Sequence, residues 1–371
     1  MNNKTNQSPT IAFFTSSMGD GGAQRTVANL VRGFAELGYS VDLVLIDPNG
    51  PYLDTLPKEV NVVDFNVDRA ITTIPSLAIY LSRNDPDIFF STIEYLNVVA
   101  LISYQLSASE ATTIIRTASV RSAHDIHTPK QQIQYRLAKR LYPRADQLIA
   151  LSNYVKDDMQ SHYQLRDRTI EVIYNPVNIS EIQSLAQQKP DHEVFYSDSE
   201  VIVNVGRFNE EKDILTTVRA FAQVVPERDV ELLLLGKGPQ KEKLTELATD
   251  LDIKERVHMP GFVDNPFRYV HSSDVFVLSS RWEGFGNVLV EAMACGTPVV
   301  ATNCPGGPSE ILDEGTYGNL VPVGDEKALA SAIERTLDDP LDESTLIDRA
   351  LDFDYEDITD QYKKAMRSIN K

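Results

Sequence analysis

Short runs of hydrophobic and β-branched residues alternate with segments of helical period along most of the chain. This alternation is typical of α/β proteins with parallel sheets. The clearest helix follows the first strand, with apolar residues at helical spacing from Val27 to Leu37 and Gly38 as its stop. We predict strands at residues 11–16, 41–46, 60–65, 87–91, 112–116, 147–151, 171–174, 201–205, 230–235, 256–259, 275–279, 298–301 and 319–321.

The strand pattern is interrupted once, near the middle of the chain. Residues 180–200 are rich in Gln and acidic side chains and hold no strand candidate, so they are expected to connect two domains. We predict two Rossmann-like domains, 1–178 and 179–353, with the active site in the cleft between them. Ligands of such sheets bind at the carboxyl ends of the strands.

Composition narrows the class of protein. The 371 residues are 42% hydrophobic and 24% charged, as expected of a soluble globular protein. The formal net charge of −19 argues against nucleic acid as a partner, because phosphate backbones need clustered cations. Two cysteines are too few for a disulfide framework. Residues 1–9 are polar and lack the apolar stretch that a signal peptide requires. The prediction is a cytoplasmic protein.

A glycine-rich loop joins the first strand to the first helix. It contains Gly21 and Gly22, where the backbone can approach a ligand closely. The N–H groups at the start of the helix could then receive an anion. A plain tight turn explains the same residues equally well, so this loop alone leaves both interpretations open.

A second loop between a strand and a helix covers residues 205–213 and carries Arg207 and Lys212. Two cations five positions apart can converge on a diphosphate. Arg would bind it through bidentate hydrogen bonds and Lys as a point charge. The alternative is a solvated loop in which Glu210 and Glu211 pair with these cations.

The most informative segment covers residues 275–298. A strand ends near Ser279, a glycine-rich turn follows, and Gly286–Leu289 lie at the start of a helix, where N–H groups favour a phosphate. Glu283 precedes the helix and Glu291 lies within it. One carboxylate can face a sugar while the other reaches a ribose diol. In the alternative interpretation, Glu283 caps the helix and Glu291 is a solvent-facing helix residue.

This segment resembles the signature of the family 4 retaining glycosyltransferases of the GT-B fold. Their pattern of Glu, seven residues and Glu, within E-G-F-G and E-A-M-A-C-G-x-P-V-V-A, runs here from Glu283 to Ala301. The continuation, residues 302–311, is similar to members that build surface polysaccharides. Arg207 and Lys212 also stand where the family has its diphosphate-binding cations. The resemblance spans nearly the whole chain and is weakest between residues 49 and 111.

The resemblance implies a role for each matching residue. Glu283 would contact the transferred sugar at the reacting centre, with Arg207 and Lys212 as the other catalytic residues, holding the diphosphate. Glu291 would bind the ribose. It further implies that residues 354–371 pack back onto the first domain. The remaining donor-binding residues would be Gly21, Gly22, Phe262, Val263, Gly284, Phe285, Gly286, Asn287, Val288 and Leu289.

One departure from the family concerns histidine. Many members place a His after the strand predicted at 112–116, where this chain has Arg116 and, further on, His124. Both are assigned to the acceptor side, and a catalytic His is not predicted. Two sequences resemble the metal-binding DxD motif of other glycosyltransferases. The first, Asp85-Pro86-Asp87, is better explained as a helix stop at Pro86. The second, Asp352-Phe353-Asp354, lies in an acidic helical tail. No metal and no cofactor are expected.

The expected reaction is transfer of a sugar from a nucleotide diphosphate sugar to a glycan or lipid-linked acceptor hydroxyl, with retention and without a metal. Two alternatives are a GT-B nucleotide-sugar epimerase and a catalytically silent nucleotide-sugar-binding subunit.

Residues 116–144 form a basic segment in this acidic chain, with seven cations and one acid. From Gln131 it is predicted to be an amphipathic helix suited to the anionic cytosolic face of a membrane. The alternative is that its apolar residues pack on the sheet while the cations are solvated.

Overall fold

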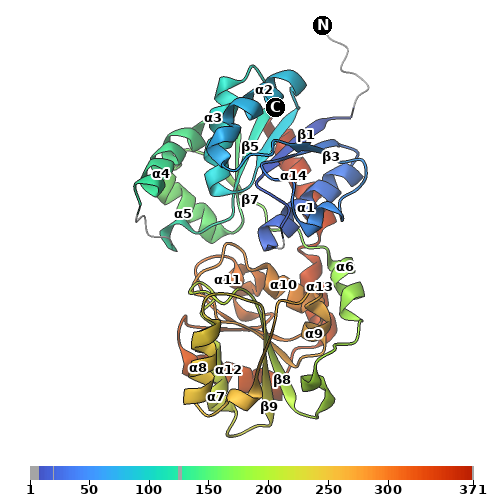
Figure 1. Ribbon diagram of the computed structural model, residues 1–371, viewed down its shortest axis with the longest axis vertical. Helices are drawn as coiled ribbons and strands as arrows, with labels where there is room; N and C mark the ends of the chain where they lie inside the picture. The colour runs from blue at the N-terminus through green and yellow to red at the C-terminus, as the bar shows by residue number, and fades with distance from the viewer. Residues whose placement is uncertain (1–7, 20, 124–127, 370–371) are drawn as a thin grey trace. The chain divides into compact units, whose positions relative to one another are not determined.

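The chain forms two compact units, each a parallel sheet covered by helices (Figure 1). The first unit is Met1–Pro176 with Tyr355–Lys371, and the second is Val177–Asp354. This is the predicted α/β class with two Rossmann-like domains. The computed structural model describes residues 8–19, 21–123 and 128–369.

The first unit is built on a seven-stranded sheet of order β3-β2-β1-β4-β5-β6-β7, in which each neighbouring pair is parallel. Its strands are β1 (Thr10–Thr15), β2 (Ser40–Leu45), β3 (Asn61–Asp64), β4 (Ile88–Ser91), β5 (Thr112–Thr117), β6 (Gln147–Ala150) and β7 (Ile170–Val172). Its helices are α1 (Gly22–Glu36), α2 (Ile74–Asn84), α3 (Glu94–Leu106), α4 (Pro129–Leu141), α5 (Asn153–Tyr163) and α14 (Tyr355–Ile369).

The last helix, α14, belongs to the core of the first unit although it follows the whole second unit in sequence. Its Tyr362 is fully buried against Phe34 of α1 and Phe90 of β4. A Cβ at Gly33 of α1 would lie 2.2 Å from the Thr359 hydroxyl oxygen, so only glycine lets the two helices approach this closely.

The second unit is built on a six-stranded parallel sheet of order β10-β9-β8-β11-β12-β13. Its strands are β8 (Glu200–Val205), β9 (Val230–Leu235), β10 (Val257–Gly261), β11 (Val275–Leu278), β12 (Val299–Thr302) and β13 (Asn319–Val321). Its helices are α6 (Ile179–Ala186), α7 (Ile214–Val224), α8 (Lys241–Asp250), α9 (Phe267–His271), α10 (Asn287–Ala294), α11 (Pro308–Ile311), α12 (Glu326–Asp338) and α13 (Glu343–Leu351).

The strand order reverses between β8 and β11, which are neighbours in the sheet although two strands separate them in sequence. At such a switch point the loops that leave the two strands diverge, and ligands of open α/β sheets bind there. The loops that follow β8 and β11 are the two in which the sequence places its catalytic candidates.

The predicted strands can be compared with the structure directly. Each strand of both sheets begins and ends within two residues of its predicted limits in the described part of the chain. No helix among the described residues is long and apolar enough to cross a membrane.

Candidate active site

The switch point of the second unit brings Lys212 and Glu283 together. Lys212 ends the loop after β8, and Glu283 lies in the loop after β11, 71 residues further along the chain. The Nζ atom of Lys212 donates a hydrogen bond of 2.6 Å to Oε1 of Glu283. Two residues predicted to contact different parts of one donor are therefore in direct contact with each other.

The electrostatic surroundings of Lys212 keep its ammonium charged. Burial acts to lower the pKa of Lys212, but the carboxylates of Glu283 and Glu211 outweigh burial and raise it above its ordinary value. The Glu211 carboxylate lies 3.7 Å from Nζ. Lys212 is thus a permanent cation at neutral pH, already balanced by two acids.

Glu283 is buried and held from several sides. Its Oε1 also accepts a 2.6 Å hydrogen bond from the Ser280 hydroxyl, and its backbone N–H donates to the Pro305 carbonyl. Gly306 (φ +128°) packs on the Glu283 carbonyl so closely that a Cβ there would lie 1.8 Å from that oxygen. Both the backbone and one carboxylate oxygen of Glu283 are therefore fixed.

The two loops are joined by contacts that the sequence did not reveal. The Arg281 backbone N–H donates to the Glu211 carbonyl at 2.8 Å, and its guanidinium meets the Asp213 carboxylate at 3.1 Å. The Ser279 hydroxyl donates to the Lys212 carbonyl at 2.9 Å. The one available sequence signal was a run of polar residues, 279–281, directly after a fully apolar strand.

Arg207 lies at the start of the same loop as Lys212 and is exposed. Its charge acts to lower the pKa of Lys212, as expected of a second cation nearby, although the acids outweigh it. Arg207 is therefore available to a ligand that approaches the loop from solvent, whereas Lys212 is mostly enclosed.

The helix α10 begins where it was predicted, directly after Gly286 at φ +104°, a backbone conformation that favours glycine. Gly284 and Phe285 lie in the turn before it. Of the N–H groups predicted to meet a diphosphate, that of Leu289 already donates to the Gly286 carbonyl at 2.9 Å. The predicted contacts of the Asn287, Val288 and Leu289 N–H groups with a diphosphate stay predictions.

The remaining predicted donor-binding residues of the second unit lie in the helix after β11 and in the loop after β10. Glu291 is buried in α10 and is not the solvent-facing residue of the alternative interpretation. Phe262 and Val263 follow β10, and the Phe262 ring is half-exposed with the Lys237 ammonium 4.9 Å from its centroid. A half-exposed aromatic ring beside a cation can stack on a nucleobase.

Gly21 and Gly22 lie in the first unit, at the carboxyl end of β1. Gly21 is the N-cap residue of α1, and Gly22 is the first residue of the helix. Gly21 has φ −87°, which any residue adopts, so backbone strain does not explain this glycine.

Arg116 was assigned to the acceptor side and counted in the basic segment 116–144. Its side chain is buried, and its guanidinium donates to the Tyr362 hydroxyl of α14 at 2.9 Å and to the Asn175 side chain. Arg116 therefore joins the end of β5 to α14 inside the first unit. His124, the other residue assigned to the acceptor side, lies outside the described residues.

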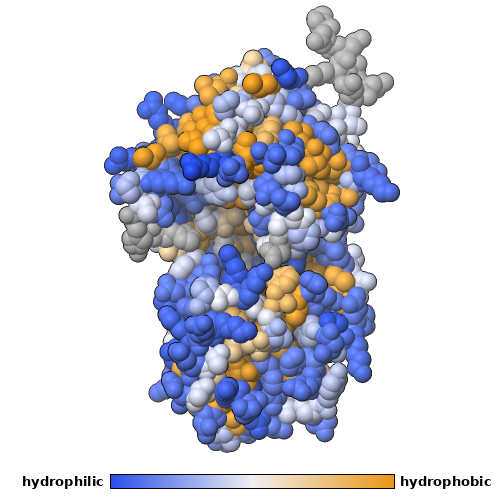
Figure 2. Space-filling model, in the orientation of Figure 1, coloured by the Kyte–Doolittle hydropathy of each residue, from blue (hydrophilic) through white to orange (hydrophobic). Residues whose placement is uncertain are grey.

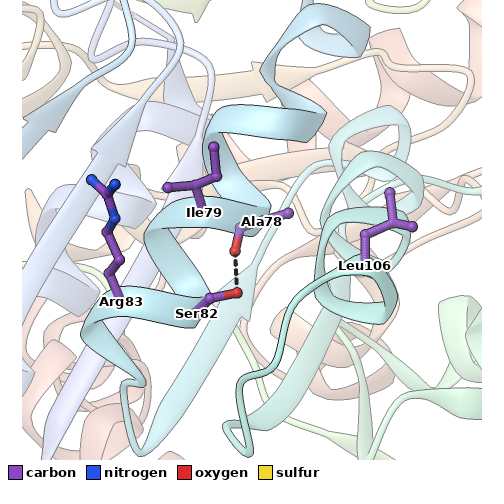
Figure 3. Close-up of a pocket in the computed structure, with 5 residues that line it drawn as sticks. All are labelled: Ala78, Ile79, Ser82, Arg83 and Leu106. Atoms are coloured by element: carbon purple, nitrogen blue, oxygen red, sulfur yellow. Dashed lines mark hydrogen bonds between the residues drawn. The ribbon is translucent and has the colours of Figure 1, made fainter.

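A shallow hollow of about 340 Å³ lies between α2 and α3 of the first unit (Figure 3). It is lined by Ala78, Ile79, Ser82, Arg83 and Leu106, none of which was predicted to bind a substrate. Ile79 and Leu106 are exposed, and Figure 2 shows hydrophobic side chains on this unit. In the described part of the chain, no group of three or more His, Cys, Asp or Glu residues is placed to hold a metal ion.

Comparison with known families assigns both units. Residues 20–181 match the family described as Glycosyltransferase Family 4, and residues 186–352 match Glycosyl transferases group 1. The chain is 27% identical over 339 residues to N-acetylgalactosamine-N,N'-diacetylbacillosaminyl-diphospho-undecaprenol 4-alpha-N-acetylgalactosaminyltransferase of Campylobacter jejuni, covering 89% of this chain and 90% of that one. It is 35% identical over 206 residues to the lipopolysaccharide core biosynthesis glycosyltransferase LpsE of Rhizobium meliloti, covering 54% and 58%.

Solved structures share the fold over nearly the whole length. The lipopolysaccharide outer core galactosyltransferase WaaB has a TM-score of 0.75 at 19% identity, covering 97% of this chain and 99% of that one. Anabaena Alr3699/HepE, solved with UDP and glucose, has a TM-score of 0.77 at 22% identity, covering 97% and 100%. The two doubly wound units have the GT-B fold of these structures. With the two sequence families matched, the chain belongs to the family 4 glycosyltransferases.

The close packing of Gly306 on Glu283 generates a prediction. Gly306→Ala should displace the Glu283 backbone, because the new Cβ would overlap its carbonyl oxygen. We expect turnover to fall on the order of 10²-fold, as for a misplaced reacting group. Gly315→Ala is the matched control, since Gly315 also has a positive φ but nothing lies within 4 Å of its Cβ position. Equal activity of the two variants would show that Glu283 is not held through Gly306.

Proposed function

We propose that the protein transfers a sugar from a nucleoside diphosphate sugar to a hydroxyl of a lipid-linked or polysaccharide glycan, with retention of configuration and without a metal ion. The observation that carries the proposal is the pairing of Lys212 with buried Glu283 at the β8/β11 switch point. The relatives named for transfer onto an undecaprenol-linked saccharide and for lipopolysaccharide core synthesis support the acceptor class.

The proposed mechanism follows from where charge develops. Breaking the anomeric bond places negative charge on the leaving diphosphate, and a cation fixed beside it lowers the barrier more than in water. Lys212 and Arg207 would supply that charge, with the N-terminus of α10 adding its dipole. Lys212 would exchange part of its contact with Glu283 for the diphosphate when the donor binds.

Glu283 would act on the sugar side of the broken bond. An ionised carboxylate stabilises the positive charge that develops on the sugar ring and can accept a hydrogen bond from a sugar hydroxyl. For retention, the acceptor would attack from the face that the diphosphate leaves, and the diphosphate would take the acceptor proton. Glu291 would bind the ribose, and Phe262 with Val263 would hold the base.

A donor screen followed by a turnover assay tests the proposed function. Among UDP-, GDP- and ADP-sugars, we expect one nucleotide to raise the melting temperature most, because a ligand bound to the native state stabilises it. That donor should then be consumed only when a glycan or lipid-linked acceptor is present. Release of free nucleotide without acceptor would indicate an epimerase, and binding without turnover a silent subunit.

The two cations generate a separate prediction. Lys212→Ala and Arg207→Ala should each lower turnover on the order of 10²-fold or more, as the loss of one electrostatic stabiliser does. Glu283→Gln should be similarly damaging. Lys243→Ala, which removes an exposed cation from α8 of the same unit, is the control. Wild-type turnover of Lys212→Ala or Arg207→Ala would exclude that cation from the mechanism.

We further propose that the protein works in the cytoplasm, with residues 116–144 docked on an anionic membrane. The helix α4 supports this, because Lys130, Arg136 and Arg140 are exposed and Ile133 is 58% exposed. Of the apolar residues of this helix, Ile133 is exposed, whereas Leu141 is buried in the core of the unit and Leu137 packs against it. The alternative interpretation therefore holds for Leu137 and Leu141 but not for Ile133. Buried Arg116, in contrast, cannot contribute to this surface.

Vesicle binding tests the docking. Replacing Arg136, Lys139 and Arg140 with Gln should weaken binding to anionic vesicles on the order of 10²-fold, since each cation near the surface contributes about 1 kcal/mol. The matched control replaces Lys241, Lys243 and Lys254 of the second unit, which removes the same net charge. Binding of the wild type should also weaken with salt. No binding at low salt, or equal loss in both variants, would contradict docking through α4.

A further inference from the structure

Ser280 shares one oxygen of Glu283 with Lys212. The Ser280 hydroxyl and the Lys212 ammonium each lie 2.6 Å from Oε1 of Glu283. In the described part of the chain, no hydrogen bond or ion pair to Oε2 accompanies them. The carboxylate is therefore anchored through one oxygen, and the other keeps its capacity to accept a hydrogen bond.

The backbone around Ser280 makes this contact a rigid one. Ser280 is fully buried and is the second residue after β11. Its carbonyl accepts a 2.6 Å hydrogen bond from the Thr302 hydroxyl at the end of the neighbouring strand β12. Because the Glu283 backbone N–H donates to the Pro305 carbonyl, both ends of the four-residue span 280–283 are held by residues 302–305.

The two side chains that donate to Oε1 differ in conformational freedom. Lys212 carries its ammonium on a flexible four-carbon stem and can turn toward a second anion. The Ser280 hydroxyl sits on a short side chain, and a hydrogen bond of this length to a charged acceptor is among the stronger ones. If Lys212 turned to a diphosphate, the short side chain of Ser280 would leave its hydroxyl on Oε1.

We propose that Ser280 is a positioning residue for Glu283, which keeps Oε1 engaged while Oε2 faces the sugar of the donor. The proposal rests on the function proposed for Glu283. It assigns Ser280 no contact with the substrate, so the nucleotide is bound without it. Its effect is on the orientation of the carboxylate in the reacting complex.

Steady-state kinetics of Ser280→Ala test this role. We expect kcat to fall roughly 10- to 100-fold, because the variant loses a hydrogen bond to a charged group. The KM for the donor and the affinity for the free nucleoside diphosphate should stay within about twofold. Ser280→Cys, nearly isosteric with a weak donor, should recover part of kcat. Ser273→Ala, which removes another buried hydroxyl of the same unit, should keep wild-type kcat.

The outcomes separate this inference from the function on which it rests. If the wild type transfers sugar and Glu283→Gln is impaired, wild-type kcat in Ser280→Ala overturns the positioning role alone. Loss of nucleotide affinity in Ser280→Ala with kcat unchanged also overturns it. A wild-type protein that transfers no sugar to any acceptor overturns the proposed function and this inference together.

Discussion

The ion pair of Lys212 with Glu283 is the contact on which the candidate site depends. Both side chains are largely withdrawn from water, with 16% and 7% of their surface exposed. Removing two charges from water costs several kcal/mol per ion, and their attraction repays this only with good geometry and further hydrogen bonds. Such a pair adds little to stability. Its arrangement is better explained by the proposed function, because the reaction needs a cation at the diphosphate beside a carboxylate at the sugar.

The parallel sheet explains why these two residues meet. Parallel strands end at one edge, and the loops after β8 and β11 leave this edge at the point where the strand order reverses. The hydrogen bonds from the Arg281 backbone N–H to the Glu211 carbonyl and from the Ser279 hydroxyl to the Lys212 carbonyl then hold the two loops together. The chemistry therefore depends on the topology of the second unit as much as on its sequence motif.

The sequence predicted the strands and the class of fold well, because alternating apolar runs and helical period depend on local patterns. It predicted the loops that meet at the switch point, since glycines and charges after apolar strands mark them. It could not predict the Ser280 contact, because a short hydroxyl bond to a carboxylate depends on tertiary placement. The burial of Arg116 was missed for the same reason, since its partner Tyr362 lies 246 residues away. The roles of Glu291 and Phe262 stay predictions.

A double-mutant cycle in kcat/KM between Lys212→Ala and Glu283→Gln tests the central claim most directly. If the two side chains act as one unit, removing the second should cost little once the first is gone. The account predicts a double variant whose loss is at least about tenfold smaller than the product of the two single losses, a coupling of ~1.4 kcal/mol. Losses that multiply would show that Lys212 and Glu283 act independently, which would contradict it.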